Sequence, residues 1–242
     1  MHSLFLSILA SVLSLSSPDG RLKVDVVPCG TDCGAPTSLD NLELSHRQSN
    51  KPLERKRQLL FVGSLEPRKN FKNLVKALEI LQERGIEIPL IMTGPQGWKN
   101  ADEVELLKNS AVAKNIQHLG FVNEEQLRQL YAESSAIVFP SFYEGFGLPV
   151  IEALSNGTPV LTSQGTVMES IAKDCGIYFD PCDAKSIADV IEKYFATPEP
   201  WNFLKLKNAA VNEILGTYRW ENSAKKLLKI FNELGQRKEA TR

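Results

Sequence analysis

The feature that most constrains the fold of this chain is a regular alternation of short apolar runs with segments of helical periodicity. Nearly continuous apolar runs are typical of strands buried on both faces of a parallel sheet. The predicted strands are residues 59–62, 88–93, 116–119, 136–139, 159–161 and 176–179. The first helical segment between them has its apolar residues at Phe71, Leu74, Val75, Leu78 and Leu81. This alternation predicts an α/β fold with a doubly wound, parallel, six-stranded, Rossmann-like sheet.

The expected strand order indicates where a ligand would bind. Strands of this kind fit the order 3-2-1-4-5-6, in which the chain reverses between the first and fourth strands. Ligands of such folds bind beyond the carboxyl ends of those two strands. The loops that follow them are residues 63–70 and 140–148. We therefore expect these two loops to form the binding site.

Capping residues mark several helix ends. Asn70 is expected to cap the helix after the first loop, and Gly85 to end it. Asn123 and Gln126 have the spacing of a capping box. Asp183 opens a predicted helix that ends near residue 195. Further helices are predicted at 102–109, 203–215 and 221–235.

The loop after the fourth strand runs through two glycines into a helix. Pro149 fits the first helical turn, where no backbone N–H is required. Backbone amides and the positive end of the helix dipole at such a loop favour a phosphate. The amides concerned belong to Gly145, Phe146, Gly147 and Leu148. The loop is therefore a candidate phosphate site.

Two glutamates, Glu144 and Glu152, flank this loop. Taken alone, they would be a solvated turn residue and an acid that complements the helix dipole. Helical side chains lean back toward the N-terminus, however, so Glu152 can reach the mouth of the loop. Carboxylates accept hydrogen bonds from hydroxyls. Amides and acids together suit a ligand that has both phosphates and hydroxyls, such as a nucleotide-sugar.

The string from Glu144 to Glu152, Glu-Gly-Phe-Gly-Leu-Pro-Val-Ile-Glu, resembles the signature of the retaining glycosyltransferases of family 4 (group 1) at every position. The resemblance implies that Glu144 is the catalytic residue beside the donor sugar and that Glu152 holds the ribose. It also implies a GT-B architecture, a pair of facing Rossmann-like domains. This chain would be the C-terminal, donor-binding half.

The basic pair Arg68 and Lys69 would in isolation be a solvated surface feature. Across from a glycine-rich helix start, it can bind a diphosphate. Residues 63–70 are also similar to the family's second landmark, where such cations stabilise the departing nucleoside diphosphate. Many relatives have an arginine directly after the glycine, where this chain has Ser64, so Arg68 is expected to serve. The resemblance also implies donor-binding roles for Gly63, for Gly94 and for the backbone of Val122 at the nucleobase.

The resemblance covers roughly residues 24–235. We interpret residues 1–57 as a remnant of a preceding domain with an interdomain strand and a linker over 33–57. Residues 58–242 would be the Rossmann-like nucleotide-sugar-binding domain with its C-terminal helices. The apolar stretch 4–13 is interpreted as the tail of a helix of the preceding domain, with a cleaved signal peptide as the alternative. In the family, the terminal helix crosses back toward the first domain.

Composition argues against several functions. A net charge of -1 with 24% charged residues gives no reason to expect a nucleic-acid partner. The four cysteines lack metal-site spacing, so we expect no metal, no disulfide framework and no cofactor other than the donor substrate. His118 is interpreted as a packed histidine. We expect a cytoplasmic protein, with a peripheral position at the inner face of the membrane left open.

These observations predict the donor-binding half of a retaining, metal-independent glycosyltransferase. It would transfer a hexosyl group from a GDP- or UDP-sugar to a glycan or lipid-linked acceptor in polysaccharide biosynthesis. The form of residues 65–70 is similar to that of mannosyltransferases, which favours a mannosyl group. The expected partner is the missing N-terminal domain or a separate chain that carries it, and the isolated chain is expected to be inactive. The main alternative is a non-catalytic sugar-nucleotide-binding or regulatory module.

Overall fold

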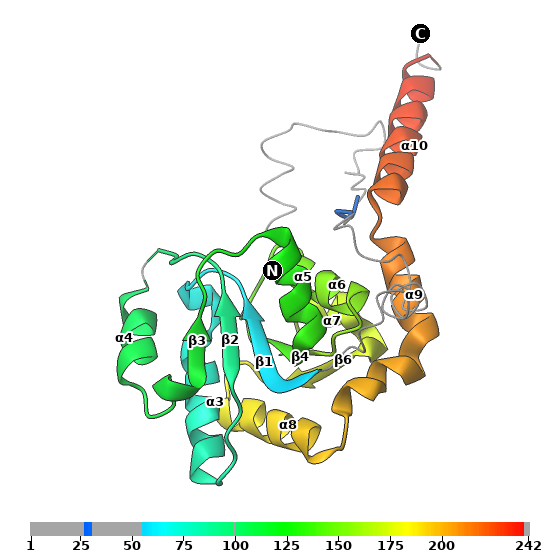
Figure 1. Ribbon diagram of the computed structural model, residues 1–242. Coiled ribbons are helices and arrows are strands. Elements are labelled where there is room, and N and C mark those ends of the chain that lie inside the picture. The colour runs from blue at the N-terminus through cyan, green and yellow to red at the C-terminus, as the bar shows by residue number, and fades with distance from the viewer. Residues whose placement is uncertain (1–26, 31–54, 99, 240–242) are drawn as a thin grey trace.

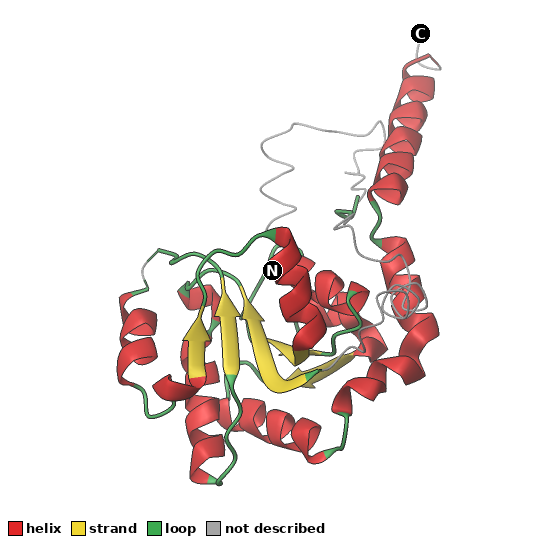
Figure 2. Ribbon diagram, in the orientation of Figure 1, coloured by secondary structure: helices red, strands yellow, loops and turns green. Residues whose placement is uncertain are grey.

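The computed structural model describes residues 27–30, 55–98 and 100–239. The predictions for residues 4–13 and for the linker up to residue 54 lie outside the described residues. A six-stranded sheet forms the centre of the fold, with helices on both faces (Figure 1, Figure 2). Its order is β3-β2-β1-β4-β5-β6, and each neighbouring pair is parallel. The predicted fold class and strand order are confirmed.

The strands are β1 (Lys56–Val62), β2 (Leu90–Thr93), β3 (Ile116–His118), β4 (Ser134–Phe139), β5 (Val160–Ser163) and β6 (Gly176–Phe179). Two of them begin before their apolar runs. The first residues of β1 are exposed, and β4 begins with two buried serines, so hydrophobicity does not reveal either start. The linker predicted to reach residue 57 therefore ends earlier. By contrast, β2 begins after Pro89, whose missing N–H cannot join the ladder.

The helices are α3 (Phe71–Glu83), α4 (Ala101–Asn109), α5 (Glu124–Glu133), α6 (Leu148–Ser155), α7 (Val167–Ala172), α8 (Ala184–Ala196), α9 (Asn208–Thr217) and α10 (Trp220–Glu239). A short 3-10 turn, η1 (Pro67–Lys69), precedes α3. The segment predicted as one helix over 203–215 is instead divided. Its first part belongs to a 3-10 helix, η4 (Pro200–Lys207), and its second part to α9.

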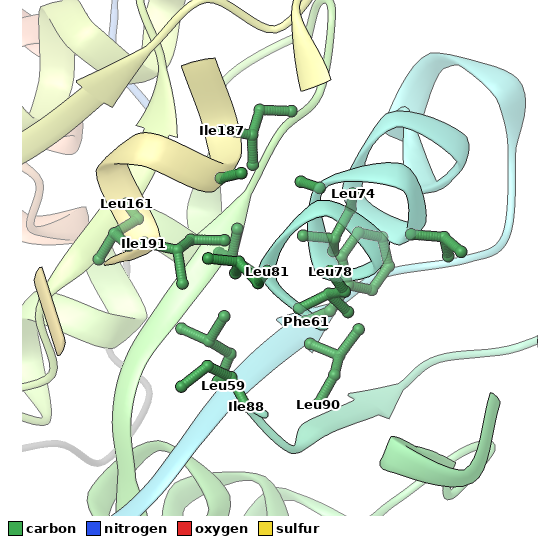
Figure 3. Packing of buried hydrophobic residues seen from close by; sticks show 14 of the residues in the cluster. Leu59, Phe61, Leu74, Leu78, Leu81, Ile88, Leu90, Leu161, Ile187 and Ile191 are labelled. Atoms are coloured by element: carbon green, nitrogen blue, oxygen red, sulfur yellow. The ribbon is translucent and has the colours of Figure 1, made fainter. Parts of the chain in front are cut away.

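The central strands of the sheet are buried on both faces, as the continuous apolar runs predicted. Leu59 and Phe61 of β1 pack on one face against α3 and α8 (Figure 3). Leu60 lies between them in sequence and packs on the opposite face with residues of α5, α6 and α7. Successive side chains of a strand point to opposite faces, so a strand with no polar alternation needs a helical layer on each side.

The helix N-caps agree with the sequence at two places and differ at a third. Asn123 and Gln126 form the predicted capping box at the start of α5. The side chain of Asp183 accepts a hydrogen bond from the amide of Lys185 at 2.8 Å, which caps α8. Asn70 does not cap α3 through its side chain, so that prediction was wrong. It adopts a left-handed conformation with φ of 58°, and its side-chain amide bonds other loops instead.

A half-buried arginine, Arg55, joins elements at the amino end of the sheet. Its Nη1 donates to the carbonyl of Ser134 at 2.7 Å, and its Nη2 donates to the carbonyl of Gly157 at 2.7 Å. A longer bond of 3.3 Å reaches the carbonyl of Tyr131 near the end of α5. Burial lowers the pKa of Arg55 to about 10, so the guanidinium is cationic at neutral pH. It binds carbonyls that the ends of α5 and α6 leave without helical partners.

The C-terminal helix α10 extends away from the sheet (Figure 1). The hydroxyl of Ser223 near its start donates to the carbonyl of Pro28 at 2.6 Å. Gly30 approaches so closely that a Cβ there would lie 2.1 Å from the backbone nitrogen of Trp220. Residues 27–30 are thus held against the start of α10. None of the helices in the described ranges is long and apolar enough to cross a membrane.

Candidate functional site

The loops after β1 and β4 lie side by side, as the strand order predicted. The amide of Phe142 donates to the carbonyl of Arg68 at 2.9 Å. The side-chain amide of Asn70 donates to the carbonyl of Pro140 at 3.0 Å and to that of Pro181 at 2.7 Å. Asn70 is almost fully buried, so these bonds are shielded from water. The side chain predicted to cap α3 therefore fixes the loop after β1 against the loops after β4 and β6.

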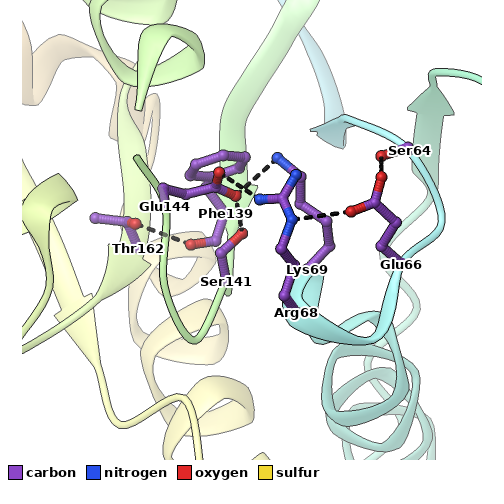
Figure 4. Close-up of polar contacts among 8 residues, drawn as sticks. All are labelled: Ser64, Glu66, Arg68, Lys69, Phe139, Ser141, Glu144 and Thr162. Atoms are coloured by element: carbon purple, nitrogen blue, oxygen red, sulfur yellow. Dashed lines mark hydrogen bonds and ion pairs between the residues drawn. The ribbon is translucent and has the colours of Figure 1, made fainter. Parts of the chain in front are cut away.

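An ionic cluster connects the two loops (Figure 4). The two carboxylate oxygens of Glu144 contact Arg68 Nη1 at 2.6 Å and Lys69 Nζ at 2.7 Å. Ser141 donates its hydroxyl proton to the same carboxylate at 2.8 Å. The side chains of Glu144 and Lys69 are only 10% and 8% exposed, which makes these contacts stronger than those of a surface ion pair. Lys69 also lies over the ring of Phe139, 4.8 Å from its centroid.

A second carboxylate, Glu66, completes the cluster. It accepts hydrogen bonds from Ser64 Oγ at 2.5 Å and from Arg68 Nε at 2.9 Å. The hydrogen bond from Ser64, with the nearby charge of Arg68, holds the pKa of Glu66 below its usual value. Glu66 and Glu144 together balance the charges of Arg68 and Lys69. Sequence analysis did not assign a role to Glu66, although its spacing from Ser64 and Arg68 allows these local bonds.

The glycine-rich loop has the predicted connection to α6. Gly147 takes the N-cap position with φ of 97°, a left-handed conformation that favours glycine. Pro149 lies in the first turn of α6, as predicted. The ring of Phe146 packs edge-on against Tyr218, with 5.4 Å between the centroids. The ring of Phe146 therefore packs against the residue that ends α9, so that only the backbone amide of Phe146 is a candidate to bind a phosphate.

Glu152 lies in the second turn of α6 and is half-buried. Its Oε2 accepts a hydrogen bond from the hydroxyl of Tyr131 on α5 at 2.7 Å. Tyr131 was not among the predicted site residues. No local pattern joins two residues 21 positions apart in sequence, because their contact depends on how α5 packs beside α6.

The loops after β1, β2 and β3 also lie close together, at the predicted donor-binding positions. Gly63 donates its amide proton to the carbonyl of Thr93 at 2.9 Å, and Gly94 donates to that of Gly120 at 2.9 Å. A Cβ on Gly94 would lie 2.2 Å from the carbonyl oxygen of Gly63, so only glycine fits. Val122 follows in the loop after β3 and is half-buried.

His118 is a structural residue in this arrangement. Its Nε2 lies 3.0 Å from the carbonyl oxygen of Gly94, within hydrogen-bonding distance. The contact joins the end of β3 to the loop after β2. This position agrees with the interpretation of His118 as a packed histidine.

Comparisons with known proteins identify a family and several relatives that are similar to this chain. The family model described as "Glycosyl transferases group 1" matches residues 43–212. The O-antigen chain mannosyltransferase B of Escherichia coli is 40% identical over 130 residues, which cover 53% of this chain and 34% of that protein.

Two solved structures show the same fold at low identity. Sucrose-phosphate synthase from Thermosynechococcus elongatus has a TM-score of 0.69 at 23% identity, over 89% of this chain and 54% of that one. Anabaena HepE in complex with UDP and glucose has a TM-score of 0.62 at 18% identity, over 87% and 56%. The chain thus spans about a third to a little over half of the length of these proteins. Since the family model covers well over half of the chain, this chain belongs to the group 1 glycosyl transferases.

Proposed function

We propose that this chain is the donor-binding part of a retaining, metal-independent glycosyltransferase of family 4. The observation that carries the proposal is the contact of Glu144 with both Arg68 and Lys69 between the loops after β1 and β4. It joins the acidic and basic landmarks of the family at the switch point of the sheet, where doubly wound folds bind ligands. The side chain of Asn70 and the amide of Phe142 already hold the two loops together. The contacts of Glu144 are therefore not needed for that purpose alone.

The donor is a GDP- or UDP-sugar. The diphosphate of such a donor carries oxygens that compete with Glu144 for Arg68 and Lys69. Once displaced, the carboxylate of Glu144 is available to accept hydrogen bonds from the hydroxyls of the sugar. The backbone amides at residues 145–148, at the start of α6, add donors of fixed direction. These groups stabilise the negative charge that builds on the leaving diphosphate during transfer, and they supply the positive charge that a metal ion supplies elsewhere.

The nucleoside is held by the remaining predicted residues. Glu152 accepts hydrogen bonds from the ribose hydroxyls, and the backbone of Val122 meets the nucleobase. Gly63 and Gly94 have no side chains, so the backbone can approach the donor closely. The structure of Anabaena HepE with UDP and glucose supports a nucleotide-sugar of this class. Relatives named as mannosyltransferases, including an O-antigen enzyme, support a hexosyl group of the mannosyl type and a glycan or lipid-linked acceptor.

The acceptor-binding groups belong to an N-terminal domain or to a separate chain that carries it. The helix α10 supports such a partner, because Leu227, Leu228 and Phe231 are 42%, 60% and 60% exposed on it. Transfer requires groups on both sides of the reacting carbon. We therefore expect the 242-residue chain to bind donor without turnover, and its activity to appear when the partner domain is added.

Titration calorimetry tests the proposed function. UDP, GDP and their sugars are titrated into the chain and into the double variant Arg68→Ala/Lys69→Ala. The diphosphates should lose far more affinity than the free nucleosides, and high salt should reduce the difference. Lys114→Ala is the matched control, since Lys114 forms an exposed ion pair with Glu87. Equal weakening of nucleoside and diphosphate would show that the pair acts through folding and would contradict the assignment.

A further inference from the structure

A single tyrosine, Tyr131, connects the hydrophobic core to the carboxylate of Glu152. Its side chain is 1% exposed and packs in the apolar layer between the sheet and α6. Its hydroxyl donates to Glu152 Oε2 at 2.7 Å. A phenol hydroxyl that donates to a carboxylate makes a charge-assisted hydrogen bond, which is shorter and stronger than one between neutral groups.

The backbone of Tyr131 is fixed as firmly as its ring. Its carbonyl accepts hydrogen bonds from Thr158 Oγ1 at 2.7 Å and from Arg55 Nη1 at 3.3 Å. Both donors come from other elements of the fold, and Thr158 is fully buried. The hydroxyl of Tyr131 is therefore held at a set position relative to α6.

A fixed donor changes what a glutamate can do. A glutamate side chain has three rotatable bonds, and immobilising it on ligand binding costs free energy. The bond to Tyr131 restricts the carboxylate before a ligand arrives. An oriented carboxylate is what recognition of a diol requires.

We infer that Tyr131 is a positioning residue that orients Glu152 toward the ribose of the donor. The inference rests on the proposed function, since it assumes that Glu152 binds a ribose. It adds a residue outside the family signature, on a different helix, that determines how well the site recognises the two ribose hydroxyls.

A second buried tyrosine provides a matched control. The hydroxyl of Tyr194 on α8 donates to the carbonyl of Ser135 at 2.6 Å, and Tyr194 is 6% exposed. Tyr194→Phe and Tyr131→Phe each remove one hydroxyl from a buried ring without changing its packing. Of these two variants, only Tyr131→Phe removes a hydrogen bond to Glu152.

The experiment measures a ribose ratio in the full chain. This ratio is the dissociation constant of the dideoxyribose analogue, which lacks both ribose hydroxyls, divided by that of the parent nucleotide. UDP and GDP are each compared with their analogue by calorimetry. Loss of hydrogen bonds to a charged group predicts a wild-type ratio of roughly tenfold or more. Glu152→Gln should bring the ratio close to one.

Tyr131→Phe should reduce the ratio several-fold by weakening UDP or GDP while leaving the analogue unchanged. Tyr194→Phe should keep the wild-type ratio. The double variant Tyr131→Phe/Glu152→Gln should have the ratio of Glu152→Gln alone, because the tyrosine acts through the glutamate. Thermal melting of both Tyr→Phe variants reports the common cost of a lost buried hydroxyl.

Two outcomes separate this inference from the proposed function. If Glu152→Gln loses the ratio and Tyr131→Phe keeps it, the inference is overturned and the ribose role of Glu152 stands. If the wild-type ratio is already one, Glu152 does not bind the ribose, and the inference about Tyr131 is overturned together with that role. Diphosphate binding through Arg68 and Lys69 is tested separately by the double alanine variant.

Discussion

Replacing Glu144 with glutamine should strengthen the binding of inorganic pyrophosphate. In the free protein, the two oxygens of Glu144 engage Arg68 and Lys69. A diphosphate that uses these cations has to displace the carboxylate. Glutamine has nearly the same size but no charge, and only one end of its amide can accept a hydrogen bond. It therefore holds at most one of the two cations, and that one more weakly.

The geometry sets the size of this effect. The contact of 2.6 Å with Arg68 is a charge-assisted hydrogen bond, worth about 1.5–3 kcal/mol when shielded from water, and the contact of 2.7 Å with Lys69 is an ion pair between two nearly buried side chains. Arg68 is 29% exposed, so water replaces part of what it loses, and its contact counts for less. The pyrophosphate complex should therefore gain about 1–2 kcal/mol, which is roughly a 5–30-fold increase in affinity.

Titration calorimetry with pyrophosphate at low and high salt measures the change. Glu192→Gln serves as the control, because Glu192 pairs with Arg84 on the surface and should not alter the affinity. With a nucleotide-sugar as ligand, the same Glu144→Gln variant should lose part of this gain, since the sugar then lacks its carboxylate acceptor. Unchanged or weaker binding of pyrophosphate would refute the idea that Glu144 and the diphosphate compete for the same cations.

Two further predictions concern how the loops are supported. Arg55→Ala leaves the carbonyls of Ser134 and Gly157 without the donor that Arg55 supplies. The substitution should lower the free energy of unfolding by at least about 1–3 kcal/mol, which is the cost of one unpaired buried acceptor. Urea denaturation measures this, and an unchanged midpoint would contradict it. Gly94→Ala should weaken diphosphate binding in calorimetry, because the new Cβ would lie 2.2 Å from the carbonyl oxygen of Gly63 and would force it away. Gly216→Ala is the control and should be neutral, because a Cβ there meets no neighbouring group within 4 Å. Retained affinity in Gly94→Ala would show that the approach of these loops does not matter for the ligand.

Much of this protein is determined by its sequence alone. The parallel sheet and its order follow from continuous apolar runs, because a strand covered on both faces has no polar alternation. The capping box at Asn123 follows from spacing, since its two hydrogen bonds join residues three apart. The pairing of the loops after β1 and β4 follows from topology, which brings the carboxyl ends of neighbouring strands together. Each of these depends on local hydrogen bonds, on burial, or on a rule of chain connection.

Only the tertiary structure decided which donors and acceptors meet within that framework. Asparagine is a common helix-capping residue. The side-chain amide of Asn70 nevertheless donates to the carbonyls of Pro140 and Pro181, which lie 70 and 111 residues away. The sequence shows that residues 68 and 69 are basic. Their pairing with Glu144, however, depends on where the three side chains lie in the folded chain. The bond from Tyr131 to Glu152 likewise requires two helices to pack side by side. Polar contacts between distant elements are short-ranged and directional, so they are fixed only when the whole core has set the positions of the backbone.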